Sequence, residues 1–104
     1  MKLLTKEIEK RIPSHYSQEK IPEKEKVVYA KFFTPFSNWT WYVTEYDSEE
    51  GIFFGLVFGH EREWCYFSLA ELQELADRKP GLVERDKYFD QCQVKDLPEE
   101  ENKE

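Results

Sequence analysis

Apolar and polar residues alternate along residues 39–46 with a period of two, which indicates a β-strand with one buried face. The predicted buried face carries Trp39, Trp41 and Val43. The opposite face carries hydroxyl groups on aromatic and β-branched side chains: Thr40, Tyr42, Thr44 and Tyr46. We therefore expect this strand to pack its tryptophans into a core and to present its hydroxyl-bearing side chains to solvent.

Three further segments have the composition of strands. Residues 27–33 combine β-branched and aromatic residues, and residues 63–67 resume this pattern after a tight turn. The segment Ile52–Phe58 is apolar on both faces, which indicates a central strand that is at least partly covered on both sides. Gly55 interrupts this segment and marks either a β-bulge or the close approach of another group.

Two helices have clear start signals. Thr5 is the predicted N-cap of a short helix at Lys6–Ile12, and a proline follows that helix directly. Ser68 and Glu71 form a predicted capping box, in which Ser68 is the N-cap residue. The helix that follows is expected to run to about Arg78 and to bury one apolar face.

Together these segments predict an α+β fold. We expect an antiparallel meander of about four strands, with the N-terminal helix and the helix after the fourth strand packed on one face. The chain of 104 residues is expected to form a single domain at residues 1–94. Ser14–Lys26 is predicted to be an exposed connection and His15 a solvated loop residue. Residues 95–104 hold five acidic residues and two lysines and are predicted to form an acidic, disordered tail.

Charge and cysteine content restrict the partners and the compartment. The formal net charge is −7, from 22 acidic and 15 basic residues, which disfavours a basic nucleic-acid-binding protein. The two cysteines, Cys65 and Cys92, are too few for a disulfide framework and favour a reducing cytoplasm. The N-terminal apolar stretch is too short for a signal peptide or a membrane span. We therefore expect a bacterial-type cytoplasmic protein with no membrane contact.

Several motifs follow one another in a distinctive order. The chain reads KFFTPFSNWTWY at residues 31–42, FFGLV at 53–57, GHE at 59–61 and YFSLAEL at 66–72. With these motifs, and with ERD at 84–86 before Tyr88 and Phe89, it resembles the family catalogued as domain of unknown function 2958. It departs from the expected pattern at Trp64–Cys65, where a smaller pair such as Leu-Gly is expected. The resemblance implies a small protein carried by bacterial plasmids and integrative elements, and it implies no activity.

The hydroxyl-bearing face of residues 39–46 is the first candidate site. Tyr and Thr side chains lose little conformational entropy at an interface, which suits recognition. If Phe53 and Val57 share this face, it carries an apolar patch that needs a cover or a partner. The alternative is ordinary cross-strand pairing on the solvent side of a sheet. The candidate binding residues are those of this face and of the turn before it, together with one residue of the connection at 59–62: Asn38, Thr40, Tyr42, Thr44, Tyr46 and His60.

A second candidate site groups His60–Glu63 with Glu45 and Asp47. A histidine beside carboxylates suits general acid–base chemistry or metal binding. The sequence lacks the second histidine that a zinc-protease helix needs, and Cys65 is expected to face the core as inert packing. The spacing assembles no nucleophile, base and orienting group, so we assign no catalytic residue, metal or cofactor.

These features favour a non-enzymatic protein-interaction or accessory module encoded on a mobile element, with an unidentified protein partner. The alternative is a protein that binds single-stranded nucleic acid on exposed aromatic side chains. That alternative is weakened by the scattered positions of the lysines. An acidic mimic of DNA is weaker still, because the acidic residues are interleaved with lysines. An enzyme that uses His60 is the remaining alternative, and the sequence does not define the oligomeric state.

Overall fold

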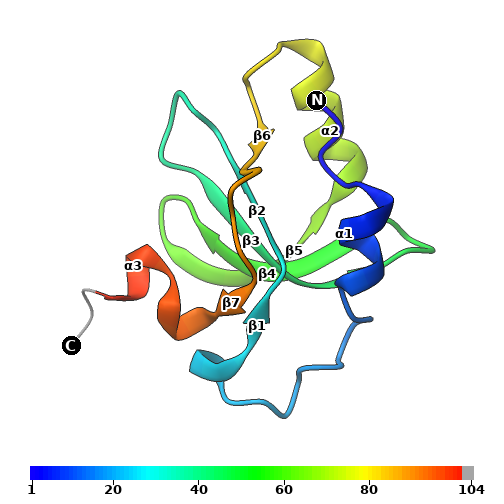
Figure 1. The fold of residues 1–104 in the computed structure, drawn as a ribbon. Helices are drawn as coiled ribbons and strands as arrows, with labels where there is room; N and C mark the ends of the chain where they lie inside the picture. Colours follow the sequence, from blue (N-terminus) through cyan, green and yellow to red (C-terminus); the bar gives the residue numbers. More distant parts are fainter. Residues whose placement is uncertain (102–104) are drawn as a thin grey trace.

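The computed structural model describes residues 1–101 and shows an α+β fold built on a five-stranded antiparallel sheet (Figure 1). The strands, in their order across the sheet, are β5 (Arg62–Ser68), β4 (Ile52–Phe58), β3 (Thr40–Asp47), β2 (Ala30–Phe33) and β6 (Glu84–Arg85). A second, two-stranded sheet pairs β1 (Val27–Val28) with β7 (Cys92–Gln93). The helical segments are α1 (Lys6–Arg11), η1 (Glu23–Glu25), α2 (Leu69–Arg78), η2 (Val94–Asp96) and α3 (Pro98–Glu101). The predicted fold class is confirmed.

Both predicted helix starts are capped by side chains. Thr5 Oγ1 accepts a hydrogen bond from the Ile8 amide at 3.3 Å, which satisfies one of the free amides at the start of α1. Ser68 Oγ accepts from the Glu71 amide at 3.2 Å and starts α2 directly after β5. These signals are local, so the sequence was sufficient to predict them.

The main core lies between the sheet and the two longer helices. In this helix-side core, Leu72 and Ala76 of α2 pack with Phe32, Val43 and Phe53 of the sheet. Ile8 of α1 and Ile12, which directly follows this helix, pack into the same core. The predicted packing of both helices on one face is therefore confirmed, and Figure 1 shows α1 and α2 on the same side of the molecule.

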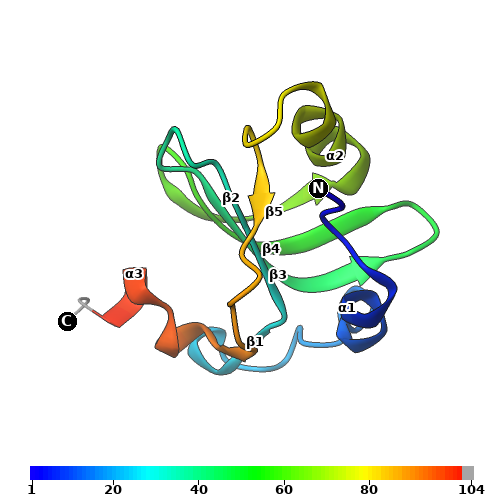
Figure 2. The same ribbon diagram turned by 45° about the horizontal axis from the view of Figure 1, so that its top comes forward.

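A second core covers the opposite face of the sheet. In this C-terminal core, Val94 and Leu97 pack with Val28, Tyr42 and Leu56, and all five side chains are fully buried. Figure 2 shows α3 and α2 at opposite sides of the molecule. The structure thus differs from the predicted disordered tail, because residues 95–101 continue the fold as η2 and α3. Residues 102–104 of that predicted tail lie outside the described residues.

Acidic side chains hold the C-terminal segment to the sheet. The Tyr42 hydroxyl donates to Glu99 Oε1 at 2.8 Å. Arg62 of β5 binds both carboxylate oxygens of Glu100, with N–O distances of 2.7 and 3.2 Å. Burial of the ring, and then the hydrogen bond to Glu99, raise the pKa of Tyr42 far above its ordinary value. The acidic residues that suggested a solvated tail therefore have buried or half-buried partners.

A β-bulge at Thr44 breaks the alternation of β3. Val43 pairs with Gly55 and Glu45 pairs with Phe54, so Thr44 is the extra residue on β3. The Thr44 hydroxyl donates to the Phe54 carbonyl at 2.9 Å, which fixes the bulge. Because one residue is inserted, side chains beyond Thr44 exchange faces relative to a strict period of two.

Gly55 lies directly opposite this bulge. A Cβ atom at this position would lie 1.8 Å from the Tyr42 carbonyl oxygen and 3.2 Å from Val43 Cα. Both neighbours are backbone atoms of the central strand, so they have little freedom to move aside. The sequence predicted a bulge or a close approach at Gly55, and the structure shows both.

We expect Gly55→Ala to lower the free energy of unfolding by about 3 kcal/mol, because the added methyl group forces β3 and β4 apart. Gly51→Ala is the matched control. Gly51 has a φ of +69° and no atom within 4 Å of an added Cβ. It should cost only about 1 kcal/mol of left-handed backbone strain. Urea denaturation followed by tryptophan fluorescence measures both, and equal losses would contradict the close approach.

The raised pKa of Tyr42 predicts a loss of stability at alkaline pH. The folded state keeps this proton to higher pH than the unfolded state, so the stabilisation is complete below the unfolded pKa of about 10 and declines above it. We expect Tyr42→Phe to be less stable by about 1 kcal/mol at neutral pH, through the lost hydrogen bond. It should also lose less stability than the unmodified protein between about pH 9 and 12. Chemical denaturation over this range gives the change in the free energy of unfolding with pH for both proteins. The same change in both would refute the assignment of the alkaline loss to Tyr42.

Candidate functional site

The six predicted binding residues occupy different environments. Asn38 and His60 are exposed in the β2–β3 and β4–β5 turns, and Thr40 is half-buried at the start of β3. The other three are buried, with exposed fractions of 0%, 1% and 9%: Tyr42, Thr44 and Tyr46. The expectation that these three side chains face solvent is therefore wrong. A binding role for Asn38, Thr40 and His60 stays a prediction.

The hydroxyl-bearing face is buried for two physical reasons. The C-terminal core covers Tyr42, and the bulge at Thr44 turns Tyr46 to the helix side. There the Tyr46 ring packs on Phe53, with ring centroids 4.6 Å apart. Burial, followed by the charges of Glu9 and Asp47, raises the pKa of Tyr46.

The predicted cluster of His60 with carboxylates is not formed. The His60 ring packs edge-on against Trp39, with centroids 5.5 Å apart, in the turn that links Phe58 to β5. Asp47 lies at the other end of the β3–β4 hairpin, where it pairs with Ile52. Within residues 1–101, no three His, Cys, Asp or Glu side chains are grouped so as to hold a metal ion.

Both cysteines are half-buried thiols. Burial raises the pKa of Cys65, with a further contribution from Glu63. Burial also raises the pKa of Cys92, with contributions from Asp96 and Asp90. A raised pKa keeps a thiol protonated at neutral pH, and the protonated form is the poor nucleophile.

A row of aromatic rings lies on β4 and β5, on the face of the sheet that also carries the C-terminal core. Phe54 lies between the rings of Trp64 and Tyr66, at centroid distances of 5.7 and 4.9 Å. Trp64 and Tyr66 are two residues apart on β5, so both side chains point to the same face. Tyr66 is 53% exposed and forms the open end of the row.

Glu45 holds a loop beside this row. Its exposed fraction is only 5%, and its two oxygens accept the amides of Tyr16 and Gln18 at 2.9 and 2.8 Å. The Gln18 side chain is also buried and bonds to the backbone of Val27 and of Thr44. The segment predicted as an exposed connection is therefore fixed to the sheet through buried polar contacts, which low-dielectric surroundings strengthen.

Tyr16 has an unusual backbone conformation in this loop. Its φ is +71°, in the left-handed region that side chains other than glycine rarely adopt. Tyr16 is 67% exposed. Its side chain, then desolvation, and then the carboxylates of Glu45 and Glu19 raise the pKa of Tyr66. Backbone strain kept at an exposed aromatic residue is a feature typical of functional sites.

His15 contributes to the same surface. The predicted solvated loop residue is half-buried, and its Nε2–H donates to the Ile52 carbonyl at 2.9 Å. Its ring lies 5.3 Å from the Tyr66 ring, between centroids. The Tyr66 ring is therefore in contact with His15 as well as with Phe54.

The loop and the sheet enclose a groove of about 390 Å³, which we call the aromatic groove. Its lining residues are Tyr16, Glu19, Glu23, Lys26, Glu45, Phe54, Trp64 and Tyr66. Three carboxylates and one ammonium group give this lining a formal charge of −2. Glu23 accepts from the Trp64 indole and pairs with Arg62 at 3.2 Å, so it fixes the far wall.

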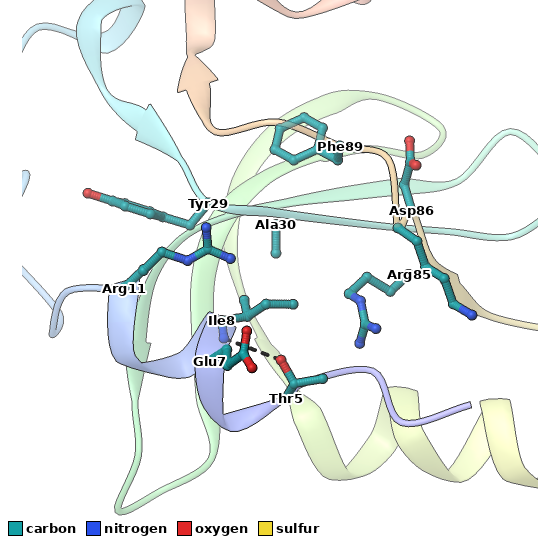
Figure 3. A pocket seen from close by; sticks show the side chains of 10 residues that line it. Thr5, Glu7, Ile8, Arg11, Tyr29, Ala30, Arg85, Asp86 and Phe89 are labelled. Atoms are coloured by element: carbon teal, nitrogen blue, oxygen red, sulfur yellow. Dashed lines mark hydrogen bonds between the residues drawn. The ribbon is translucent and has the colours of Figure 1, made fainter.

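A second groove, of about 400 Å³, lies between α1 and the chain that follows β6 (Figure 3). Arg11 extends into it from α1, beside the Tyr29 ring. Arg85 forms hydrogen bonds to the N-terminal segment: its Nη1 donates to the carbonyls of Lys2 and Leu3 at 2.6 and 2.9 Å. Two acidic and three basic side chains line this groove, so its lining has no strong charge of one sign.

Sequence reasoning missed the aromatic groove. The available signal was the spacing of Trp64 and Tyr66, which places two large aromatic rings on one face of a strand. The groove also depends on Tyr16 and Glu45, which are 29 residues apart along the chain. Their contact follows from the bulge and the loop conformation, neither of which a periodic pattern reveals.

Comparison with known proteins places the chain in a family. The comparisons with curated proteins and with solved structures found no match. In residues 1–101, each helix is too short or too polar to span a bilayer. The model of the family described as Protein of unknown function (DUF2958) matches residues 3–95, which is most of the chain. The resemblance inferred from the motifs is thereby confirmed, and the protein belongs to the DUF2958 family.

Proposed function

We propose that this protein is a non-enzymatic interaction module of a bacterial mobile element that binds a protein partner in the cytoplasm. The observation that carries this proposal is the aromatic groove, where Tyr16 and Tyr66 are more than half exposed beside a rigid sheet. Tyrosine side chains are frequent at the energetic centres of protein interfaces, because they bring a large contact area at low conformational cost.

Neighbouring side chains restrict the Tyr66 ring, and such preorganisation favours binding at an interface. Phe54 and His15 both pack against its ring, which restricts its orientation before a partner binds. Preorganised side chains lose little entropy on binding, and more of the contact energy then appears as affinity. The neighbouring loop is also fixed, through the bonds of Glu45 to Tyr16 and Gln18.

The charge of the molecule favours a protein partner over nucleic acid. Single-stranded nucleic acid needs a positive groove beside its stacking platform. The aromatic groove instead has three carboxylates against one lysine. In the groove of Figure 3, Arg11 and Lys87 are accompanied by Glu7 and Asp86. Asp86 also pairs with Lys31 at 3.8 Å. Binding to nucleic acid is thus the alternative outcome of the test below.

We expect Tyr66→Ala to reduce capture of the partner from a lysate of the source organism by about tenfold or more. Tyr88→Ala is the matched control, because Tyr88 is 93% exposed and lies outside the aromatic groove. Circular dichroism verifies that both variants are folded, and nuclease treatment separates protein from nucleic-acid partners. Equal capture by the two variants, or capture abolished by nuclease, would contradict the proposal.

A further inference from the structure

β5 is an open edge of the sheet. It pairs with β4 on one side only, and it is seven residues long. Within the described chain, its outward backbone amides and carbonyls have no hydrogen-bond partner in another segment. Such an edge is a template for an added strand, because each unpaired group can bond to an extended chain.

The aromatic groove lies beside this edge, and β5 itself supplies one wall of it. Trp64 and Tyr66 point to the groove side of β5, while Glu63 is exposed on the other side. Side chains directly opposite each other on paired strands lie about 5 Å apart. Alternate side chains of a strand added to β5 would therefore lie beside Trp64 and Tyr66.

The chemistry of the groove suits a cation. Lysine and arginine side chains are attracted to the faces of aromatic rings, and this attraction is strengthened where carboxylates are close. The Glu19 carboxylate is exposed at the groove and near enough to Tyr66 to influence its titration. Glu45 contributes a further negative charge at the base. Lys26 donates to the Gln18 carbonyl and Arg62 pairs with Glu23. Within residues 1–101, Glu19 and Glu45 are thus the two carboxylates of the lining that have no basic side chain as a partner.

We propose that the partner docks as an extended basic segment that pairs with β5 and places a lysine or arginine side chain in the aromatic groove. This inference rests on the proposed function and specifies the chemistry of its partner. An acidic segment would be repelled by the lining, as would a phosphate backbone. A basic strand is also consistent with the net charge of −7, which attracts positively charged partners over long range.

The test uses the full chain and synthetic peptides of about seven residues, the length of an ordinary strand. One peptide alternates lysine with threonine and valine, and its matched control carries glutamate in place of lysine. A third peptide carries a central proline, which cannot donate to the strand ladder. NMR titration reports shifts of the β5 amides and of the Trp64 indole. We expect saturable shifts with the lysine peptide alone, weakening as salt is raised.

Two variants then test the groove itself. Glu19→Gln and Tyr66→Leu should each weaken binding of the lysine peptide by about three- to fivefold. Glu49→Gln is the matched control. Glu49 is exposed in the β3–β4 turn, so this substitution removes the same charge away from the groove. Loss of the same size in Glu49→Gln would show that only net charge matters, and the groove assignment would then be overturned.

The remaining outcomes are equally decisive. Equal binding of the lysine and glutamate peptides would overturn the cation requirement, and equal binding of the proline peptide would overturn strand pairing. Equivalent shifts with tetramethylammonium chloride at the same concentration would indicate a site for small organic cations and overturn docking of a segment. If the lysine peptide fails to bind while capture of a partner still depends on Tyr66, the proposed function stands and this inference falls.

Discussion

The close contact between Gly55 and the backbone of Tyr42 sets the course of the central hairpin. Because Gly55 has no side chain, β3 can approach β4 and accommodate one extra residue at Thr44. Because of that extra residue, the side chains of β3 beyond Thr44 point to the opposite faces from those that a strict alternation predicts. Tyr42 faces the C-terminal core and Tyr46 the helix-side core, although a strict period of two places both on one face.

The aromatic groove follows from the same bulge. Beyond Thr44, the carboxylate of Glu45 lies on the outer face, where it binds the amides of Tyr16 and Gln18. This contact fixes a loop that would otherwise have little apolar area to hold it, and it keeps Tyr16 in its left-handed conformation. The groove is therefore a consequence of strand geometry, and two of its lining residues, Trp64 and Tyr66, belong to the edge strand β5.

Local signals in the sequence predicted much of the fold, while long-range packing decided the site. The caps at Thr5 and Ser68 depend on near neighbours, and a glycine inside an apolar strand is itself a signal of a bulge or a close approach, so these features were predictable. The burial of Tyr42 depends on Leu97, in a segment whose acidic composition suggested disorder. Composition cannot show that Glu99 accepts from a buried tyrosine, and the candidate surface was misplaced for this reason.

The central claim is that the hydroxyl-bearing face of β3 is core and that the aromatic groove is the recognition surface. Hydroxyl-radical footprinting with mass spectrometry tests it most directly, because oxidation follows the exposure of each side chain. In the free protein, Tyr16 and Tyr66 should oxidise rapidly and Tyr42 slowly; a bound partner should protect Tyr66 and leave Tyr88 reactive. Oxidation of Tyr42 as fast as Tyr88, or a partner that leaves Tyr66 unprotected, would contradict the account.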